Sequence, residues 1–383
     1  AIDTGFIVYN DWTYPNFIKL LDELNVDSQP TEMSFSVRCD DSGIEYGGSN
    51  LNTLFAQRSN IFKPAFHRMI RDIVRFNREA IQDLDDGQLP AGMTLGNYLE
   101  SNCYSESFIY QYVLPMGCAI WSASTERMTE FPIRFFIQFF KNHGLLSIKN
   151  RPQWRVIKGG SRNYLSPLTK SFKDSISVNA SVKCVRRRGA GIELVMNHGQ
   201  ILKYDQVVIA CHSDQALALL DDPTEEERSA LSSIPYQQND VVLHTDESLL
   251  PRARRAWSSW NYLLKKRFQE RAVLSYDMNI LQGISSKTTF CVTLNATDLI
   301  SENKIIEKFH YSHPVFSLES ISAAERINQL NGTLNTWFAG AYLGNGFHED
   351  GVKSGLRVAE LINILPNLNK QNNKPKAAAS AYA

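Results

Sequence analysis

A strand, a glycine-rich loop and a helix follow one another near the end of the chain, and this order constrains the fold most. Residues 336–340 read Thr-Trp-Phe-Ala-Gly and predict a strand, and apolar spacing predicts a helix over 348–362. Between them lie Gly344 and Gly346, and glycine lets a backbone adopt positive φ and approach a ligand closely. The first turn of a helix presents N–H groups and a partial positive charge. This order predicts an α/β protein with a ligand at the start of the helix, although similar turns also occur where they serve only packing.

A second segment predicts part of the same sheet. Residues 205–211 (Asp-Gln-Val-Val-Ile-Ala-Cys) form a nearly continuous apolar stretch, which is typical of a parallel strand buried on both faces. A helix with an Ala/Leu face is predicted over 213–220. Residues 192–196 and 201–204 predict a hairpin, whereas the pattern over 51–140 is mostly helical.

Composition excludes several classes of function. The chain has 383 residues, of which 43% are hydrophobic. A chain of this length is too long for one simple core, and its length therefore predicts two domains. Forty basic residues balance forty acidic ones, so there is no electrostatic case for a nucleic-acid partner. The six cysteines are scattered and the histidines lack metal-ligand spacing, which predicts no metal site and a reducing, cytoplasmic compartment. No apolar run reaches the roughly 18 residues that a membrane helix needs.

The loop and helix at 338–355 resemble the C-terminal flavin signature of the flavin-containing amine oxidase and phytoene desaturase superfamily. There a strand ending in Ala-Gly leads to Gly-x-x-Glu-x-x-x-x-x-Gly, and Gly346, Glu349 and Gly355 hold those places here. Residues 205–210 are similar to the D-x-V-V-x-A strand of the same superfamily.

Three further segments resemble one subfamily. Residues 3–10, 151–155 and 346–351 are similar to predicted FAD/NAD-binding proteins that are often encoded near cyclopropane fatty acid synthases. The first segment begins with Asp3-Thr4-Gly5, which resembles the D-x-G that passes near the flavin ring. The resemblance implies an FAD cofactor, a small-molecule or lipid substrate, and a functional link to a cyclopropane fatty acid synthase-type enzyme.

The resemblance also implies a Rossmann-like FAD-binding domain built from separated segments, with a mixed α+β substrate domain inserted between them. The expected FAD-binding segments are 1–28, 153–222 and 328–366, the substrate segments are 29–152 and 223–327, and 367–383 is expected to be a disordered tail. The residues expected at the cofactor are Asp3, Thr4, Gly5, Val182, Ala210, Gly340, Ala341, Gly346, Phe347, His348 and Glu349.

The sequence departs from the superfamily at three places. It contains no Gly-x-Gly-x-x-Gly between a strand and a helix, the motif that holds the FAD pyrophosphate. Because Ala1 opens a strand-like stretch, we expect a truncated or processed N-terminus, about 30 residues that carried this motif, and poor FAD binding without them. Residues 238–242 contain no Lys, which amine oxidases often place near flavin N5. Ala341-Tyr342 replaces the usual acidic residue after Ala-Gly, and both of these differences count against simple amine oxidation.

Flavin oxidation of a C–H bond depends mainly on positioning and needs few acid/base groups. His348 is a candidate catalytic acid, base or donor because imidazole titrates near neutral pH, and the alternative is a first-turn residue that points to water. Tyr342 is a second catalytic candidate. Tyr9, Trp121 and Trp154 are candidate substrate residues. The alternative is that they are aromatic residues of the hydrophobic core, where such side chains are common.

We therefore expect an FAD-dependent oxidoreductase that oxidises or desaturates an apolar substrate, of the fatty-acyl or lipid class, by hydride transfer to flavin N5. A flavin amine oxidase is a second hypothesis, and a non-catalytic scaffold without FAD is a third. The phenylalanine-rich run 131–140 predicts a substrate tunnel, a peripheral membrane face with Arg134 and Lys141 at the headgroups, or a buried core helix, which we favour.

Overall fold

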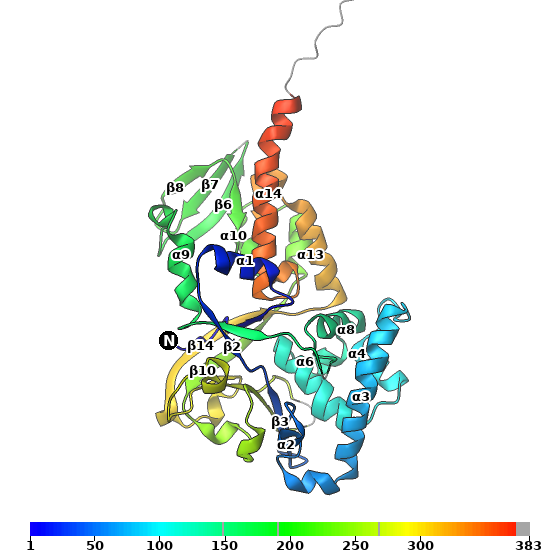
Figure 1. Cartoon of the computed structure of the whole chain (residues 1–383). Helices are drawn as coiled ribbons and strands as arrows, with labels where there is room; N and C mark the ends of the chain where they lie inside the picture. Colours follow the sequence, from blue (N-terminus) through cyan, green and yellow to red (C-terminus); the bar gives the residue numbers. More distant parts are fainter. Residues whose placement is uncertain (148, 190, 267–268, 373–383) are drawn as a thin grey trace, which may run out of the picture. The chain divides into compact units, whose positions relative to one another are not determined.

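The computed structural model describes residues 1–147, 149–189, 191–266 and 269–372 (Figure 1). The chain divides into two compact units, each assembled from two separated segments. Unit 1 contains Ala1–Ile176 and Tyr236–Leu318, and unit 2 contains Ser177–Pro235 and Glu319–Ala383. The assignment of FAD-binding and substrate domains to segments of the chain stays a prediction.

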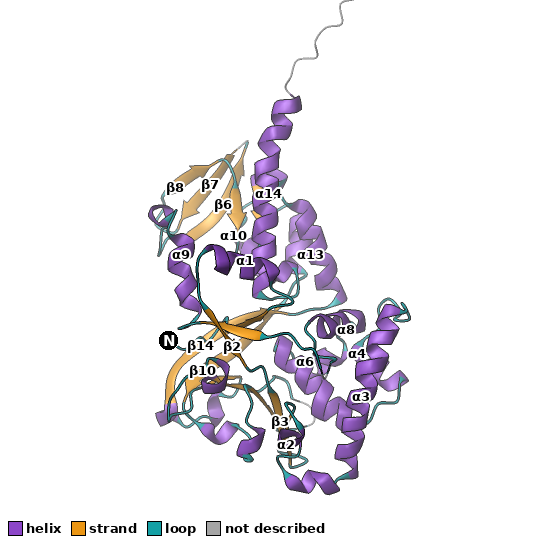
Figure 2. Ribbon diagram, viewed as in Figure 1, coloured by secondary structure: helices purple, strands orange, loops and turns teal. Residues whose placement is uncertain are grey.

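Unit 1 is built on a mixed sheet with the strand order β14-β10-β13-β12-β11-β3-β4 and a smaller sheet with the order β1-β5-β2 (Figure 2). In the larger sheet β3 and β11 run parallel, and the other neighbours are antiparallel. The strands are β1 (Val8–Asn10), β2 (Ser28–Thr31), β3 (Phe35–Cys39), β4 (Ile44–Gly47), β5 (Trp154–Ile157), β10 (Tyr236–His244), β11 (Trp260–Leu264), β12 (Leu274–Asp277), β13 (Cys291–Leu294) and β14 (Ile305–Pro314).

A helical region follows the β3–β4 hairpin, as the pattern over 51–140 predicts. Its elements are α2 (Leu51–Leu54), η1 (Arg58–Phe62), α3 (Pro64–Asp85), α4 (Leu95–Ser101), α5 (Glu106–Phe108), the π-helix η2 (Ile109–Val113), α6 (Leu114–Trp121), α7 (Thr125–Thr129) and α8 (Ile133–Asn142). Unit 1 also contains the helices α1 (Pro15–Glu23), α9 (Leu165–Thr169) and α12 (Met278–Leu281). Thr94 begins α4 by accepting a hydrogen bond from the Asn97 N–H, a side-chain cap that is typical of threonine.

The phenylalanine-rich run forms α8, and its rings belong to the core of unit 1. Phe136 and Phe140 are buried and stack with their centroids 4.0 Å apart, and Trp121 lies against the same rings. Of the three interpretations of this run, the buried core helix is therefore the one that the structure shows.

Unit 2 contains an antiparallel sheet, a parallel strand pair and the helices that follow them. The antiparallel sheet has the order β6-β7-β8, and β9 pairs with β15. The elements are β6 (Val182–Arg188), β7 (Gly191–Met196), β8 (Ile201–Tyr204), β9 (Val207–Ile209), α10 (Ser213–Leu219), α11 (Glu225–Ser232), α13 (Leu318–Leu330), β15 (Thr336–Phe338), η10 (Ala341–Leu343) and α14 (His348–Asn372). The predicted β7–β8 hairpin, the strand at 336–340 and the helix that begins near 348 are confirmed.

Two expectations for unit 2 need correction. The strand at 205–211 is shorter than predicted and is not buried on both faces, since Val208 is 45% exposed. Within the described residues β9 has only β15 as a strand neighbour, so one face is left uncovered at Val208. The predicted disordered tail begins inside α14, which continues to Asn372, and residues 373–383 lie outside the described residues.

A buried ion pair joins β6 to α11. The Arg187 guanidinium donates two hydrogen bonds to the Glu227 carboxylate, at 2.6 and 2.9 Å, and the two side chains are 3% and 1% exposed. Glu227 also completes a capping box with Thr224 at the start of α11.

We predict that Glu227→Gln lowers the free energy of unfolding by about 3 kcal/mol, because it leaves a buried guanidinium without its closest counter-charge. The amide can still complete the capping box, so the change isolates the charge. Asp221→Asn is the matched control, since Asp221 pairs with the half-exposed Arg186, and it should cost less than about 1 kcal/mol. Urea denaturation measures both values, and equal losses in the two variants would contradict the prediction.

Candidate functional site

The parallel pairing of β9 and β15 places two strand-to-helix connections at the same edge of unit 2. Val207 pairs with Thr336 and Ile209 with Phe338, and the Ala339 N–H donates to the Ile209 carbonyl at 3.1 Å. Because the carboxyl ends of parallel strands meet at one edge, Ala210 and Gly340 both lie at the edge where the chain leaves the sheet. Helices α10 and α14 begin beyond this edge, and ligands of α/β folds bind at such positions.

The loop between β15 and α14 is shaped around its glycines. Gly346 has φ +86°, a left-handed conformation that favours glycine. A Cβ on Gly340 would lie 2.5 Å from the Tyr342 ring, so this close approach also requires glycine. The Gly340 N–H donates to the Ser354 hydroxyl at 2.9 Å, which ties the loop to the second turn of α14.

Asp350 organises the start of α14, although the sequence analysis did not single it out. Its carboxylate accepts a hydrogen bond from the Phe347 N–H at 3.0 Å. A Cβ on Gly344 would lie 2.4 Å from the same carboxylate, so the loop closes tightly around it. Burial raises the pKa of Asp350, and its backbone hydrogen bonds oppose that rise. The position of Asp350, two residues after the predicted helix start, could have indicated this role. An acidic side chain in the first turn of a helix can accept a hydrogen bond from an N–H group that has no partner within the helix.

Two further glycines leave an open surface on α14. Gly351 and Gly355 lie four residues apart and therefore on the same side of the helix. A Cβ built on either glycine would have no heavy atom within 4 Å. This side of the helix can accept a flat ring against its backbone, and the N-terminal N–H groups and helix dipole favour negative charge beside it. The residues present therefore fit the flavin implied by the sequence resemblance.

Two predicted site residues around the helix start, Tyr342 and Glu349, are buried, and a third, His348, is half-buried. Burial lowers the pKa of His348 to about 4, so its imidazole is uncharged at neutral pH. The Glu349 carboxylate is 3% exposed and lies 3.7 Å from the Lys353 ammonium. At the start of α14, His348 is thus neutral and Glu349 is paired with Lys353.

The predicted cofactor residues Asp3, Thr4 and Gly5 belong to unit 1, whereas the others belong to unit 2. Asp3 is hydrogen-bonded to Ser161 and Gln282. Its carboxylate accepts a hydrogen bond from the Ser161 N–H at 2.9 Å and another from the Gln282 side-chain amide at 2.9 Å. The Asp3 N–H donates back to the Gln282 amide oxygen at 2.9 Å. Burial raises the pKa of Asp3, and the hydrogen bonds from Ser161 oppose that rise.

The hydrogen bond between Ser161 and Asp3 explains why two glycines precede Ser161. Gly159 and Gly160 both have positive φ, at +80° and +103°, which turns the Ser161 N–H toward Asp3. Nothing in the sequence indicated that Gln282, which lies 279 positions from Asp3, would be its partner.

The predicted substrate residues are spread over unit 1. Tyr9 is 2% exposed and packs edge-on against Phe17. Trp121 is 6% exposed among the rings of α8, and Trp154 lies on β5 with its ring 6.4 Å from that of His143. Their role as substrate residues stays a prediction, as do Val182 at the start of β6 and the other cofactor assignments.

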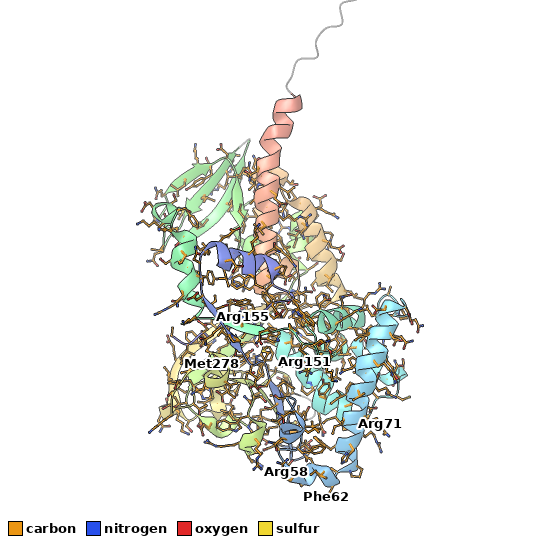
Figure 3. All side chains as sticks on the ribbon, viewed as in Figure 1. Arg58, Phe62, Arg71, Arg151, Arg155 and Met278 are labelled. Atoms are coloured by element: carbon orange, nitrogen blue, oxygen red, sulfur yellow. The ribbon has the colours of Figure 1, made fainter. Side chains whose placement is uncertain are left out.

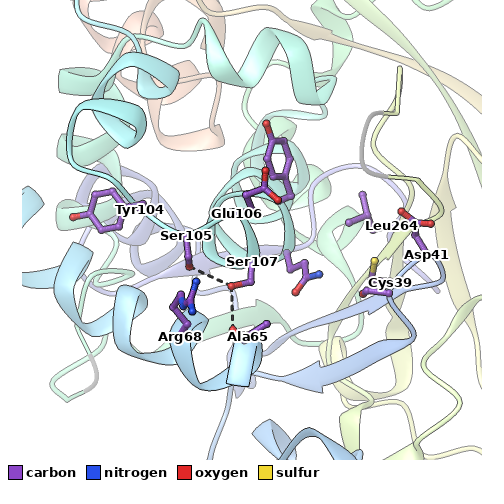
Figure 4. Close-up of a pocket in the computed structure, with 12 residues that line it drawn as sticks. Cys39, Asp41, Ala65, Arg68, Tyr104, Ser105, Glu106, Ser107 and Leu264 are labelled. Carbon is purple, nitrogen blue, oxygen red and sulfur yellow. Dashed lines mark hydrogen bonds between the residues drawn. The ribbon is translucent and has the colours of Figure 1, made fainter. Parts of the chain in front are cut away.

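A cavity of about 690 Å³ lies elsewhere in unit 1 (Figure 4). Residues of β3, α3, α5 and η2 line it, among them Cys39, Arg68, Glu106 and Gln111. None of the predicted cofactor or substrate residues lines this cavity.

Comparison with known proteins gives a family and a fold. The family model described as flavin containing amine oxidoreductase matches residues 1–268, and no curated protein sequence matches the chain. Cyclohexylamine oxidase from Brevibacterium oxydans IH-35A has a similar structure, with a TM-score of 0.64 and 12% identity over 95% of this chain and 88% of that chain. A CLA-producing fatty acid isomerase from P. acnes has a TM-score of 0.63 and 13% identity over 94% and 86% of the two chains. Wild-type putrescine oxidase bound to putrescine has a TM-score of 0.58 and 14% identity over 92% and 87%. These similarities confirm the predicted fold class.

The low pKa of His348 predicts a pH-dependent stability. The unfolded chain binds a proton at this imidazole near pH 6.5, whereas the folded chain resists it down to about pH 4. Stability from this group is therefore fully present above pH 6.5 and is lost as the pH falls toward 4. We expect His348→Gln to lose about 2 kcal/mol less free energy of unfolding between pH 7 and pH 5 than the wild type does. Urea denaturation at the two pH values tests this, and parallel losses would contradict it.

Proposed function

The chain belongs to the flavin containing amine oxidoreductase family, and we propose that it oxidises or desaturates an apolar substrate of the fatty-acyl or lipid class. Family membership confirms the two coarser expectations, an oxidoreductase and an FAD cofactor. The observation that carries the finer proposal is that both carboxylates in the first turn of α14 already have a partner, and that of Asp350 accepts a hydrogen bond from the Phe347 N–H. There His348 is uncharged at neutral pH and Glu349 lies beside Lys353.

A cationic amine and an apolar chain place different demands on such a site. An amine needs a partner for its charge or a base that removes its proton. The loop after β15 offers Ala341 and Tyr342 and no acidic residue that could pair with an amine. An apolar chain carries no charge that needs a partner. Support also comes from the CLA-producing fatty acid isomerase, an enzyme of similar fold that acts on a fatty acid.

The residues of α14 would perform three tasks. The N–H groups and dipole at its start would favour negative charge on the ring system placed there. Gly351 and Gly355 would allow the ring to approach the helix backbone. Bound FAD would supply, at its N5 atom, the acceptor for a hydride taken from a substrate C–H bond. The proton released with that hydride needs an acceptor from the chain, and His348 is the candidate because it is unprotonated at neutral pH.

The first test is anaerobic spectroscopy of the purified protein supplied with FAD. We expect flavin absorption bands in the purified protein, and bleaching of those bands by fatty acids or phospholipids but not by primary amines. Bleaching by amines alone, with peroxide formed in air, would replace the proposal by an amine oxidase. No bound flavin even at excess FAD would leave the non-catalytic scaffold.

A second test uses the open side of α14. Gly351→Leu should abolish flavin binding because the side chain fills the space that lies open beside the helix. It should not lower the melting temperature, because leucine has a helix propensity about 0.8 kcal/mol better than that of glycine. Gly351→Ala is the graded comparison and should weaken binding less. Unchanged flavin binding by the leucine variant would show that the ring does not lie against this side.

A further inference from the structure

We propose that the segment from α2 to the first turns of α3 binds the surface of an anionic phospholipid bilayer. This surface, called the 51–74 surface below, consists of the exposed side chains between Leu51 and Val74. It contains none of the residues assigned to the flavin or its substrate, so the inference stands independently of the proposed function.

The first observation is a group of exposed apolar side chains. Phe62 is 84% exposed and Leu51 is 75% exposed, and Ile61 and Val74 are 45% and 53% exposed. Phe62 and Ile61 lie on η1, directly before α3 begins. Single exposed apolar residues are ordinary, but a group on one short segment is typical of an interaction site.

The second observation is the charge around these side chains. The segment carries Arg58, Lys63, Arg68 and Arg71, and its only acidic residue is Asp72. Asp72 is buried and lies 3.6 Å from Arg75. The Arg58 guanidinium donates only to neutral partners, the Phe55 carbonyl and the Asn52 side chain. In the part of the chain that the structure describes, no carboxylate lies within 4.0 Å of the cationic groups of Lys63, Arg68 or Arg71.

Helix geometry brings the basic residues to one side of α3. Pro64, His67, Arg68 and Arg71 follow the spacing i, i+3, i+4, i+7 and are exposed, whereas Phe66, Met69 and Phe76 on the other side are buried. Figure 3 shows Arg58 and Phe62 at the N-terminal end of α3 and Arg71 farther along the same helix. The Phe66 ring packs edge-on against Tyr46 and Phe55, which holds this end of the helix in place.

The arrangement suits a bilayer better than it suits a protein partner. An interfacial segment buries aromatic and aliphatic side chains among the acyl chains while Lys and Arg remain at the anionic headgroups. The 51–74 surface has both kinds of residue and almost no acid to repel phosphate. Within the described residues no helix is long and apolar enough to span a membrane, so attachment would be interfacial. Arg68 and Ala65 also line the cavity of Figure 4, which therefore adjoins this surface, and Asp41 and Glu106 are acidic residues of the same lining.

The test is cosedimentation of the full chain with vesicles of phosphatidylcholine alone and of phosphatidylcholine mixed with phosphatidylglycerol. We expect binding to the mixed vesicles only, and weaker binding at higher salt because ions screen exposed charges. Phe62→Ser should weaken binding about tenfold, the effect of removing one inserted aromatic side chain. Arg71→Glu should weaken it about thirtyfold, since it changes two unit charges near the headgroups.

Two control variants match these changes elsewhere in the chain. Val178→Ser removes an apolar side chain of similar exposure, 79%, and Lys287→Glu reverses an exposed charge. Both should bind as the wild type does. Thermal melts check that all four variants fold, which is expected because each replaced side chain is exposed.

Two results would overturn the proposal. The first is a failure of the vesicle test, which means that the wild type does not bind the mixed vesicles or that the test and control variants bind them equally. The other is a concentration-dependent dimer in sedimentation velocity that Phe62→Ser dissociates, together with no vesicle binding, which would identify the 51–74 surface as a contact between two copies of this chain.

Discussion

The parallel pairing of β9 with β15 is the constraint on which the candidate site depends. These short strands come from segments more than a hundred positions apart, yet their register brings Ala210 and Gly340 to the same edge. The loop and helix that follow β15 are then oriented by where that strand ends. A shift of one residue in this pairing would turn every side chain of β15 to the opposite face, so the position of α14 and its glycines follows from it.

Burial controls the chemistry of the polar residues in both units. Asp3, Asp350 and His348 are all held in surroundings that disfavour their charged forms, and hydrogen bonds from backbone N–H groups compensate the two carboxylates. Such groups organise turns and helix starts through hydrogen bonds to the backbone. The consequence is a candidate site suited to chemistry that depends on positioning more than on ionised catalysts.

The apolar residues of unit 1 fall into two classes that sequence hydrophobicity does not distinguish. The rings of α8, such as Phe136 and Phe140, are buried against one another, whereas Phe62 on η1 is 84% exposed. The buried rings contribute to stability through area removed from water. Phe62 contributes little of that kind, which is why an external partner explains its position better than packing does.

The sequence by itself determined the local elements and the family. The strand, glycine loop and helix at 336–362 were predictable because apolar spacing and glycine conformations act within a few residues. The resemblance correctly indicated a flavin oxidoreductase, as the match over residues 1–268 shows. The buried core helix at α8 was already the favoured interpretation of the sequence, and the structure confirmed it. Only the tertiary structure decided that Gln282 meets Asp3 and that Val208 stays exposed on a two-strand pair. The physical reason is that burial and long-range hydrogen bonds depend on which distant segments pair, and the spacing of residues along a chain does not specify those partners.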